Sequence, residues 1–229
     1  ALEQDDTVKG INIIYICSNR DLAQQNLKRL NITGQKETAV ATRLSLLATE
    51  SSRLQRGHGT GHTKPINLVS FTPWTSFSST KNWRGNAEER SLLVLLLDKF
   101  LNHNETQKRA TRAIFRAPVR SMDRFTGYVS DLAKKLGTHI DPEIVAGFEK
   151  RLRDSQTLQD FVSLRDLMTD DQVPEDRHLD ISCVIKNMRG MLSQASAQSI
   201  EPNLVIMDEF QRFKTLLDPE SGDEAAELA

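Results

Sequence analysis

The run Leu204-Val-Ile-Met-Asp208-Glu209 is the most informative part of this sequence. Four consecutive apolar residues lead directly into two adjacent carboxylates. A short continuous apolar run is typical of a strand that is buried on both faces, as in a parallel sheet. In open α/β sheets, ligands bind beyond the carboxyl ends of the strands. We therefore expect a buried strand that delivers Asp208 and Glu209 to a binding edge.

A strand followed by Asp-Glu is the Walker B arrangement, and each carboxylate has a chemical use there. The first acid, Asp208, can hold a hydrated Mg²⁺ ion that bridges nucleotide phosphates. The second acid, Glu209, can orient or deprotonate an attacking water. The alternative is an acidic cap on a helix that follows the strand, a position that Asp favours in any protein.

Two further short apolar runs predict strands over residues 11–17 and 66–71, and a helix is expected from Asp21 onward. Residues 36–54 are ambiguous: Val40, Leu44 and Leu47 fit a helix, while residues 43–47 also fit a strand, which we favour because the run at 66–71 needs neighbours in a sheet. Together these segments predict strand–helix–strand units and a parallel sheet.

Between residues 87 and 198 the pattern changes to amphipathic helices, which we expect near 88–101, 141–153, 157–168 and 178–197. The fold class is therefore α/β: a partial, RecA-like parallel sheet (1–86 and 199–229) with a large helical insertion (87–198). The side chains expected in the core of the insertion are Leu92, Leu95, Leu96, Phe148, Phe161, Val184, Ile185 and Met188.

Residues 18–25 read Ser-Asn-Arg-Asp-Leu-Ala-Gln-Gln. This segment resembles motif Ia of DEAD-box and related superfamily 2 helicases, Pro-Thr-Arg-Glu-Leu-Ala-x-Gln. Residues 68–75 similarly resemble motif Ib through Thr72 and Pro73. With Asp208-Glu209-Phe-Gln as motif II, the three motifs follow in the family order. The chain thus resembles part of the first RecA-like domain of a DExx-type superfamily 2 helicase or translocase.

The resemblance implies an enzyme that hydrolyses ATP with Mg²⁺ and moves along DNA or RNA. It implies Asp208 and Glu209 as catalytic residues, Asp208 as the Mg²⁺ ligand through water, and Gln211 as a nucleotide contact. It also implies nucleic-acid contacts at Asn19, Arg20, Thr72 and Thr75. A separate basic stretch, which lies on one helical face and includes Arg112 and Arg116, is a further candidate to hold nucleic acid or a partner subunit; the alternative is a helix face that is simply solvated.

The composition limits the remaining possibilities. Thirty basic and 31 acidic residues give a net charge of −1, which excludes a basic field over the whole chain. The two cysteines exclude a disulfide framework and a four-cysteine zinc site, and they fit a cytoplasmic protein. No apolar run is long enough to span a bilayer, so no membrane partner is expected. His58 and His62 lie in a glycine-rich loop with no carboxylate or thiol nearby, which disfavours zinc.

No phosphate-binding Gly-x-x-x-x-Gly-Lys-Ser/Thr motif occurs in the sequence. Because the chain starts at Ala1 in a helix-like segment, we expect that this motif lies upstream in a longer protein. The alternative is a helical interaction module on a degenerate RecA-like scaffold without ATPase activity. A non-helicase ATPase of the P-loop class is a second alternative, which the motif Ia resemblance disfavours.

Overall fold

The computed structural model describes residues 10–18, 20–30, 38–41, 43–50, 54, 66–72, 83–137, 140–168 and 173–208. The fold is mixed α/β and mostly helical. The chain divides into two compact units. We call residues 1–77 with 196–229 the sheet unit, and residues 78–195 the helical unit.

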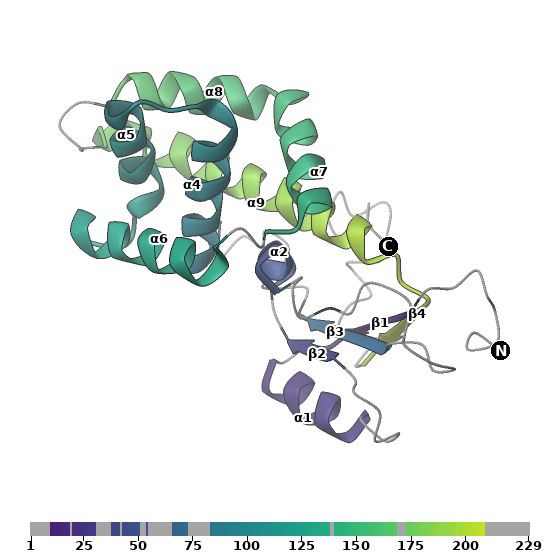
Figure 1. The fold of residues 1–229 in the computed structure, drawn as a ribbon. Coiled ribbons are helices and arrows are strands. Elements are labelled where there is room, and N and C mark those ends of the chain that lie inside the picture. The colour runs from purple at the N-terminus through teal and green to yellow at the C-terminus, as the bar shows by residue number, and fades with distance from the viewer. Residues whose placement is uncertain are drawn as a thin grey trace. The chain divides into compact units, whose positions relative to one another are not determined.

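The sheet unit contains a four-stranded sheet with the order β2-β3-β1-β4 (Figure 1). The strands are β1 (Ile11–Ile16), β2 (Thr38–Ala41), β3 (Ile66–Phe71) and β4 (Leu204–Met207). All three strand pairings are parallel. The prediction that the segments at 11–17, 66–71 and 203–207 lie parallel in one sheet is therefore confirmed. The expectation that the last of these strands is buried is wrong, because β4 is at the end of the strand order and its Leu204 and Val205 are each 48% exposed.

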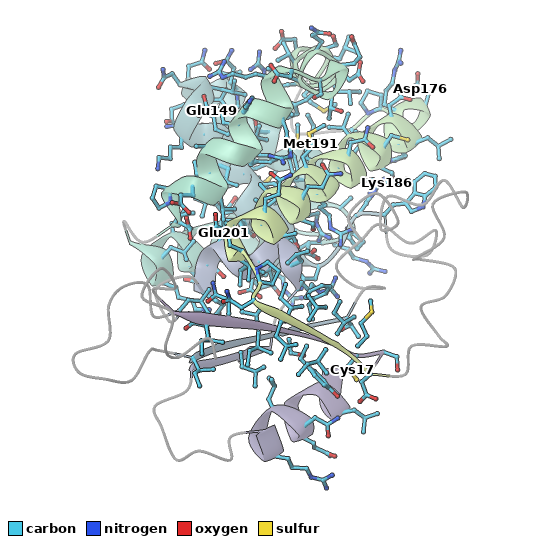
Figure 2. All side chains as sticks on the ribbon, turned by 90° about the vertical axis from the view of Figure 1, so that its right-hand side faces the viewer. Cys17, Glu149, Asp176, Lys186, Met191 and Glu201 are labelled. Carbon is cyan, nitrogen blue, oxygen red and sulfur yellow. The ribbon has the colours of Figure 1, made fainter. Side chains whose placement is uncertain are left out.

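Helix α1 (Arg20–Leu30) covers one face of this sheet (Figure 1). A cluster of buried residues joins the helix to the strands; it consists of Tyr15, Cys17, Leu27 and Leu68. Cys17, which is labelled in Figure 2, is completely buried, as expected for a thiol that ends a core strand.

The strand expected over 43–47 is wrong. Residues Leu44–Leu46 form a 3-10 turn and α2 (Leu47–Glu50) follows it, while the neighbouring strand β2 lies earlier in the chain. Six consecutive residues from Leu44 to Thr49 are buried. A turn of helix held within the core satisfies its own backbone groups, and Thr49 Oγ1 adds a hydrogen bond of 2.7 Å to the carbonyl of Leu46. The apolar residues alone did not distinguish this arrangement from a strand.

The helical unit consists of the helices that follow Trp83 in the chain, up to and including most of α9. They are α4 (Ala87–Leu101), α5 (Glu105–Arg116), α6 (Met122–Leu136), α7 (Pro142–Arg153), α8 (Gln156–Asp166) and α9 (His178–Ile200), whose last residues belong to the sheet unit. The four helices expected from the sequence are confirmed. Of the eight expected core residues all are buried except Leu95, which is half-buried; Leu93 and Leu97 on the same helix are buried too.

Buried charges hold the start of α4 to α9. Arg189 donates from Nε and Nη2 to Oε1 of Glu89, at 3.1 and 2.9 Å. Oε2 of Glu89 accepts from the backbone N–H of Asn86, which completes a capping box at the start of α4. Gly85 has φ +63°, and a Cβ there would lie 2.3 Å from Arg189 Nε, so this position requires glycine.

Candidate functional site at the carboxyl edge of the sheet

Three strands end side by side at the carboxyl edge of the sheet. The backbone N–H of Cys17 donates to the carbonyl of Phe71 at 3.3 Å, and that of Asp208 donates to the carbonyl of Ile16 at 2.8 Å. These two bonds extend the parallel ladder just past the strands. Asp208 therefore lies beside the end of β1, at the edge where open α/β sheets bind ligands.

The carboxylate of Asp208 is held by two polar side chains. The hydroxyl of Tyr15 on β1 donates to Oδ2 at 2.5 Å. Nδ2 of Asn26 on α1 lies 3.3 Å from the same oxygen and 2.7 Å from the Tyr15 hydroxyl. Burial and the bond to the Asp208 carboxylate raise the pKa of Tyr15 to about 12, so the phenol stays protonated and remains a donor at neutral pH.

The second oxygen of Asp208, Oδ1, has no partner among the residues that the structure describes. Asp208 itself is half-buried. One carboxylate oxygen is thus fixed by the protein and the other is left for water or for a ligand. Such a group fits a water-mediated ligand of Mg²⁺, which is usually held by one or two carboxylates together with waters and phosphates.

Among the described residues, Asp208 does not belong to a cluster of metal ligands. In the described part of the chain, no group of three or more His, Cys, Asp or Glu side chains is close enough to hold a metal ion. A cation here would therefore depend on the phosphates of a bound nucleotide and on water for its remaining ligands.

The end of β3 contributes two hydroxyl side chains. Thr72, which the resemblance implies as a nucleic-acid contact, follows β3 directly and is buried. Ser70 is 1% exposed, and its Oγ has no hydrogen-bond partner among the described residues. A buried hydroxyl without a partner is energetically costly.

Several predicted site residues lie outside the described residues. They are Asn19, Thr75, Glu209 and Gln211. Arg20 begins α1, so the predicted backbone-contact segment leads into the helix that carries Asn26; the side chain of Arg20 is among those that the structure does not describe.

The basic stretch belongs to the helical unit. Arg112 is half-buried, and its Nη2 lies 3.7 Å from Oδ2 of Asp98. Arg116 is also half-buried and donates from Nη1 to the carbonyl of Arg120 at 2.5 Å. The Nε atoms of Arg112 and Arg116 are buried and have no partner among the described residues. Both guanidinium groups are therefore partly engaged within the unit, whereas Arg124 is exposed and donates from Nε to the hydroxyl of Tyr128 at 3.0 Å.

The sequence alone did not identify Tyr15 and Asn26 as part of this site. The available indication was a phenol within the otherwise largely aliphatic strand 11–16, because a buried Tyr hydroxyl usually finds a hydrogen-bond partner. Its partner, Asp208, is far away in the sequence, and only the pairing of β1 with β4 brings the two together.

None of the helices in the described ranges is both long enough and apolar enough to cross a membrane. Comparison with protein-family models, with curated proteins and with solved structures found no match to this chain.

Proposed function

We propose that this chain is part of the first RecA-like domain of a superfamily 2 helicase or translocase, in which Asp208 and Glu209 act in the hydrolysis of ATP. The observation that carries the proposal is the position of Asp208. It follows a strand that pairs in parallel with β1, and its carboxylate keeps one oxygen without a partner among the described residues.

Bound Mg-ATP would supply the γ-phosphoryl group and the charge of the metal at this edge. Asp208 would hold a water of the metal shell through Oδ1, and Glu209 would orient or deprotonate the attacking water. Ser18 and Thr72 lie at the ends of β1 and β3. By the resemblance, the segments that follow these two strands would contact the sugar–phosphate backbone, which fixes a track without reading its sequence. Thr72 itself is buried, so Arg20 at the start of α1 is the contact to test.

The test is ATP turnover by the full-length protein, measured as phosphate release with and without single-stranded nucleic acid. Asp208→Asn should weaken Mg²⁺-dependent turnover. Glu209→Gln should leave nucleotide binding almost intact and slow hydrolysis by ~10²–10⁴-fold, the usual contribution of a general base. Unchanged turnover in both variants would contradict the proposal. Residues 1–229 alone should be inactive because they contain no phosphate-binding loop.

The nucleic-acid part of the proposal has its own test. Arg20→Ala should weaken the binding of single strands about equally for all sequences and should flatten the dependence of affinity on salt, because a phosphate contact releases a counterion. An unchanged salt slope would mean that Arg20 only braces the segment before α1.

The alternative function is a helical interaction module on a non-catalytic scaffold. One observation favours it: a groove of about 350 Å³ lies between α8 and α9, with Leu164 and Val184 among its lining and the exposed side chain of Leu167 beside them. If full-length protein with an intact upstream phosphate-binding loop shows no ATP turnover, this alternative becomes the better explanation.

A further inference from the structure

The hydrogen bonds around Asp208 form a triangle that joins three separate elements. Tyr15 belongs to β1, Asn26 to α1, and Asp208 to the end of β4. The Asn26 amide donates to the Tyr15 hydroxyl at 2.7 Å, and this hydroxyl donates in turn to Oδ2 of Asp208. Hydrogen bonds to a carboxylate are stronger than those between neutral groups, so this arrangement restrains the carboxylate.

The Tyr15 side chain, which donates to the carboxylate of Asp208, is itself held in place by packing. Tyr15 is 4% exposed and packs in the cluster with Cys17, Leu27 and Leu68. Its ring cannot turn away without disrupting that packing. Because the Tyr15 hydroxyl and the Asn26 amide both donate to Oδ2, the plane of the Asp208 carboxylate is fixed, and Oδ1 is the oxygen that remains for a ligand.

We infer that Tyr15 and Asn26 are positioning residues for Asp208: they fix its carboxylate so that Oδ1 meets the water shell of a divalent cation bound with nucleotide. The inference rests on the proposed function, in which Asp208 binds that cation through water. Residues that orient a metal ligand from outside the coordination shell typically change metal affinity by ~10–100-fold when they are removed.

A purely structural role for the same bonds makes a different prediction. If the triangle only braces β1 against β4 and α1, removing a donor lowers stability and leaves cation affinity unchanged. The chain offers a matched control, because Asn203 joins β1 and β4 at the amino end of the same pair. Its Oδ1 accepts from the backbone N–H of Asn12 at 2.8 Å, far from the carboxyl edge.

The experiment compares Tyr15→Phe, Asn26→Ala, Asn203→Ala and Asp208→Asn in the full-length protein. The probe is the Mn²⁺ complex of a non-hydrolysable ATP analogue, and its affinity is followed by the electron paramagnetic resonance of Mn²⁺. Unfolding by urea gives the stability of each variant. We expect Tyr15→Phe and Asn26→Ala to weaken Mn²⁺–nucleotide binding by ~10-fold or more, while Asn203→Ala keeps wild-type affinity at a similar loss of stability.

Two results would overturn the inference, and only the second of them would also contradict the proposed function. If Asp208→Asn weakens Mn²⁺–nucleotide binding but Tyr15→Phe and Asn26→Ala do not, the positioning role is wrong and the proposed function stands. If Asp208→Asn also leaves the affinity unchanged, Asp208 is no ligand of the cation and the proposed function fails as well. Asn26 is half-buried, so its variant remains informative if Tyr15→Phe does not fold.

Discussion

The helical unit and the sheet unit differ in how their buried polar groups are paired and in how well their apolar side chains are buried. In the helical unit the buried charges of Glu89, Arg90 and Arg189 each have several partners. In the sheet unit the apolar side chain of Leu204 on β4 is 48% exposed. Buried polar atoms that lack a partner among the described residues occur in both units, at Ser70 Oγ and at the Nε atoms of Arg112 and Arg116. The two units therefore differ in what their interiors contain: a paired network of buried charges in the helical unit, and a strand that leaves apolar surface exposed in the sheet unit.

The largest effect that we expect comes from breaking the buried ion pair of the helical unit. Arg189 and Glu89 have side chains that are 2% and 0% exposed. Arg189→Met leaves a buried carboxylate without its main partner and should lower the free energy of unfolding by ~3–5 kcal/mol. Urea denaturation followed by far-ultraviolet circular dichroism measures this loss.

The control for this variant is the exposed pair of Arg153 and Glu149, whose side chains are 51% and 33% exposed. Arg153→Met should change stability by no more than ~1 kcal/mol. Adding Glu89→Leu to Arg189→Met should recover part of the loss, because the unpaired charge is then removed as well. A loss below ~1 kcal/mol for Arg189→Met would mean that the network does not stabilise the helical unit.

The second comparison uses the same substitution in both units. Leu96 on α4 is completely buried, whereas Leu204 on β4 is about half exposed. Leu96→Ala should cost ~2–5 kcal/mol through lost burial and a cavity. Leu204→Ala should cost about 1 kcal/mol or less, because much of its surface already contacts water. Equal losses, measured by urea denaturation, would show that β4 is covered in the folded protein and would remove this contrast between the units.

A smaller effect is expected at the start of α5. Asn104 Oδ1 accepts from the backbone N–H of Gln107 at 2.9 Å, and the Gln107 side chain bonds back to the N–H of Asn104. Asn104→Ala should lower the free energy of unfolding by ~1 kcal/mol, whereas Asn104→Gly should lower it by only about a few tenths of a kcal/mol. Thermal unfolding of the two variants gives the comparison; the same loss for both would argue against a capping role.

The two units also differ in how far the sequence predicts them. Four helices of the helical unit follow from local information such as the Asp141 cap of α7 and the apolar periodicity of α9, whereas α5 and α6 were not among the helices expected from the sequence. The parallel strands were likewise predictable, because β1, β3 and β4 each read as a short apolar run before a polar segment. The turn at Leu44–Leu46 and the triangle of Tyr15, Asn26 and Asp208 were not, because both depend on which distant residues meet in the core.

The last and smallest effect concerns the titration of a buried tyrosine in the sheet unit, compared with an exposed tyrosine in the helical unit. The protein has two tyrosines, Tyr15 and Tyr128, and the second is exposed on α6. In a Tyr128→Phe variant, the near-ultraviolet absorbance of tyrosinate reports Tyr15 alone. Its pKa should be about 12 rather than 10, mainly because burial disfavours the phenolate and also because the phenol is bonded to Asp208.

The raised pKa has a consequence for stability that is confined to alkaline solution. Below pH 10 the phenol is protonated in both the folded and the unfolded chain, so Tyr15 adds no pH dependence. Between pH 10 and about 12 the unfolded chain loses this proton first, and stability should fall as the pH rises. Asp208→Asn should move the midpoint part of the way back toward 10, because burial remains when the carboxylate charge is removed. A midpoint that Asp208→Asn leaves unchanged would mean that the Tyr15–Asp208 bond is not formed in solution, and a midpoint near 10 before the substitution would mean that the phenol is not buried either.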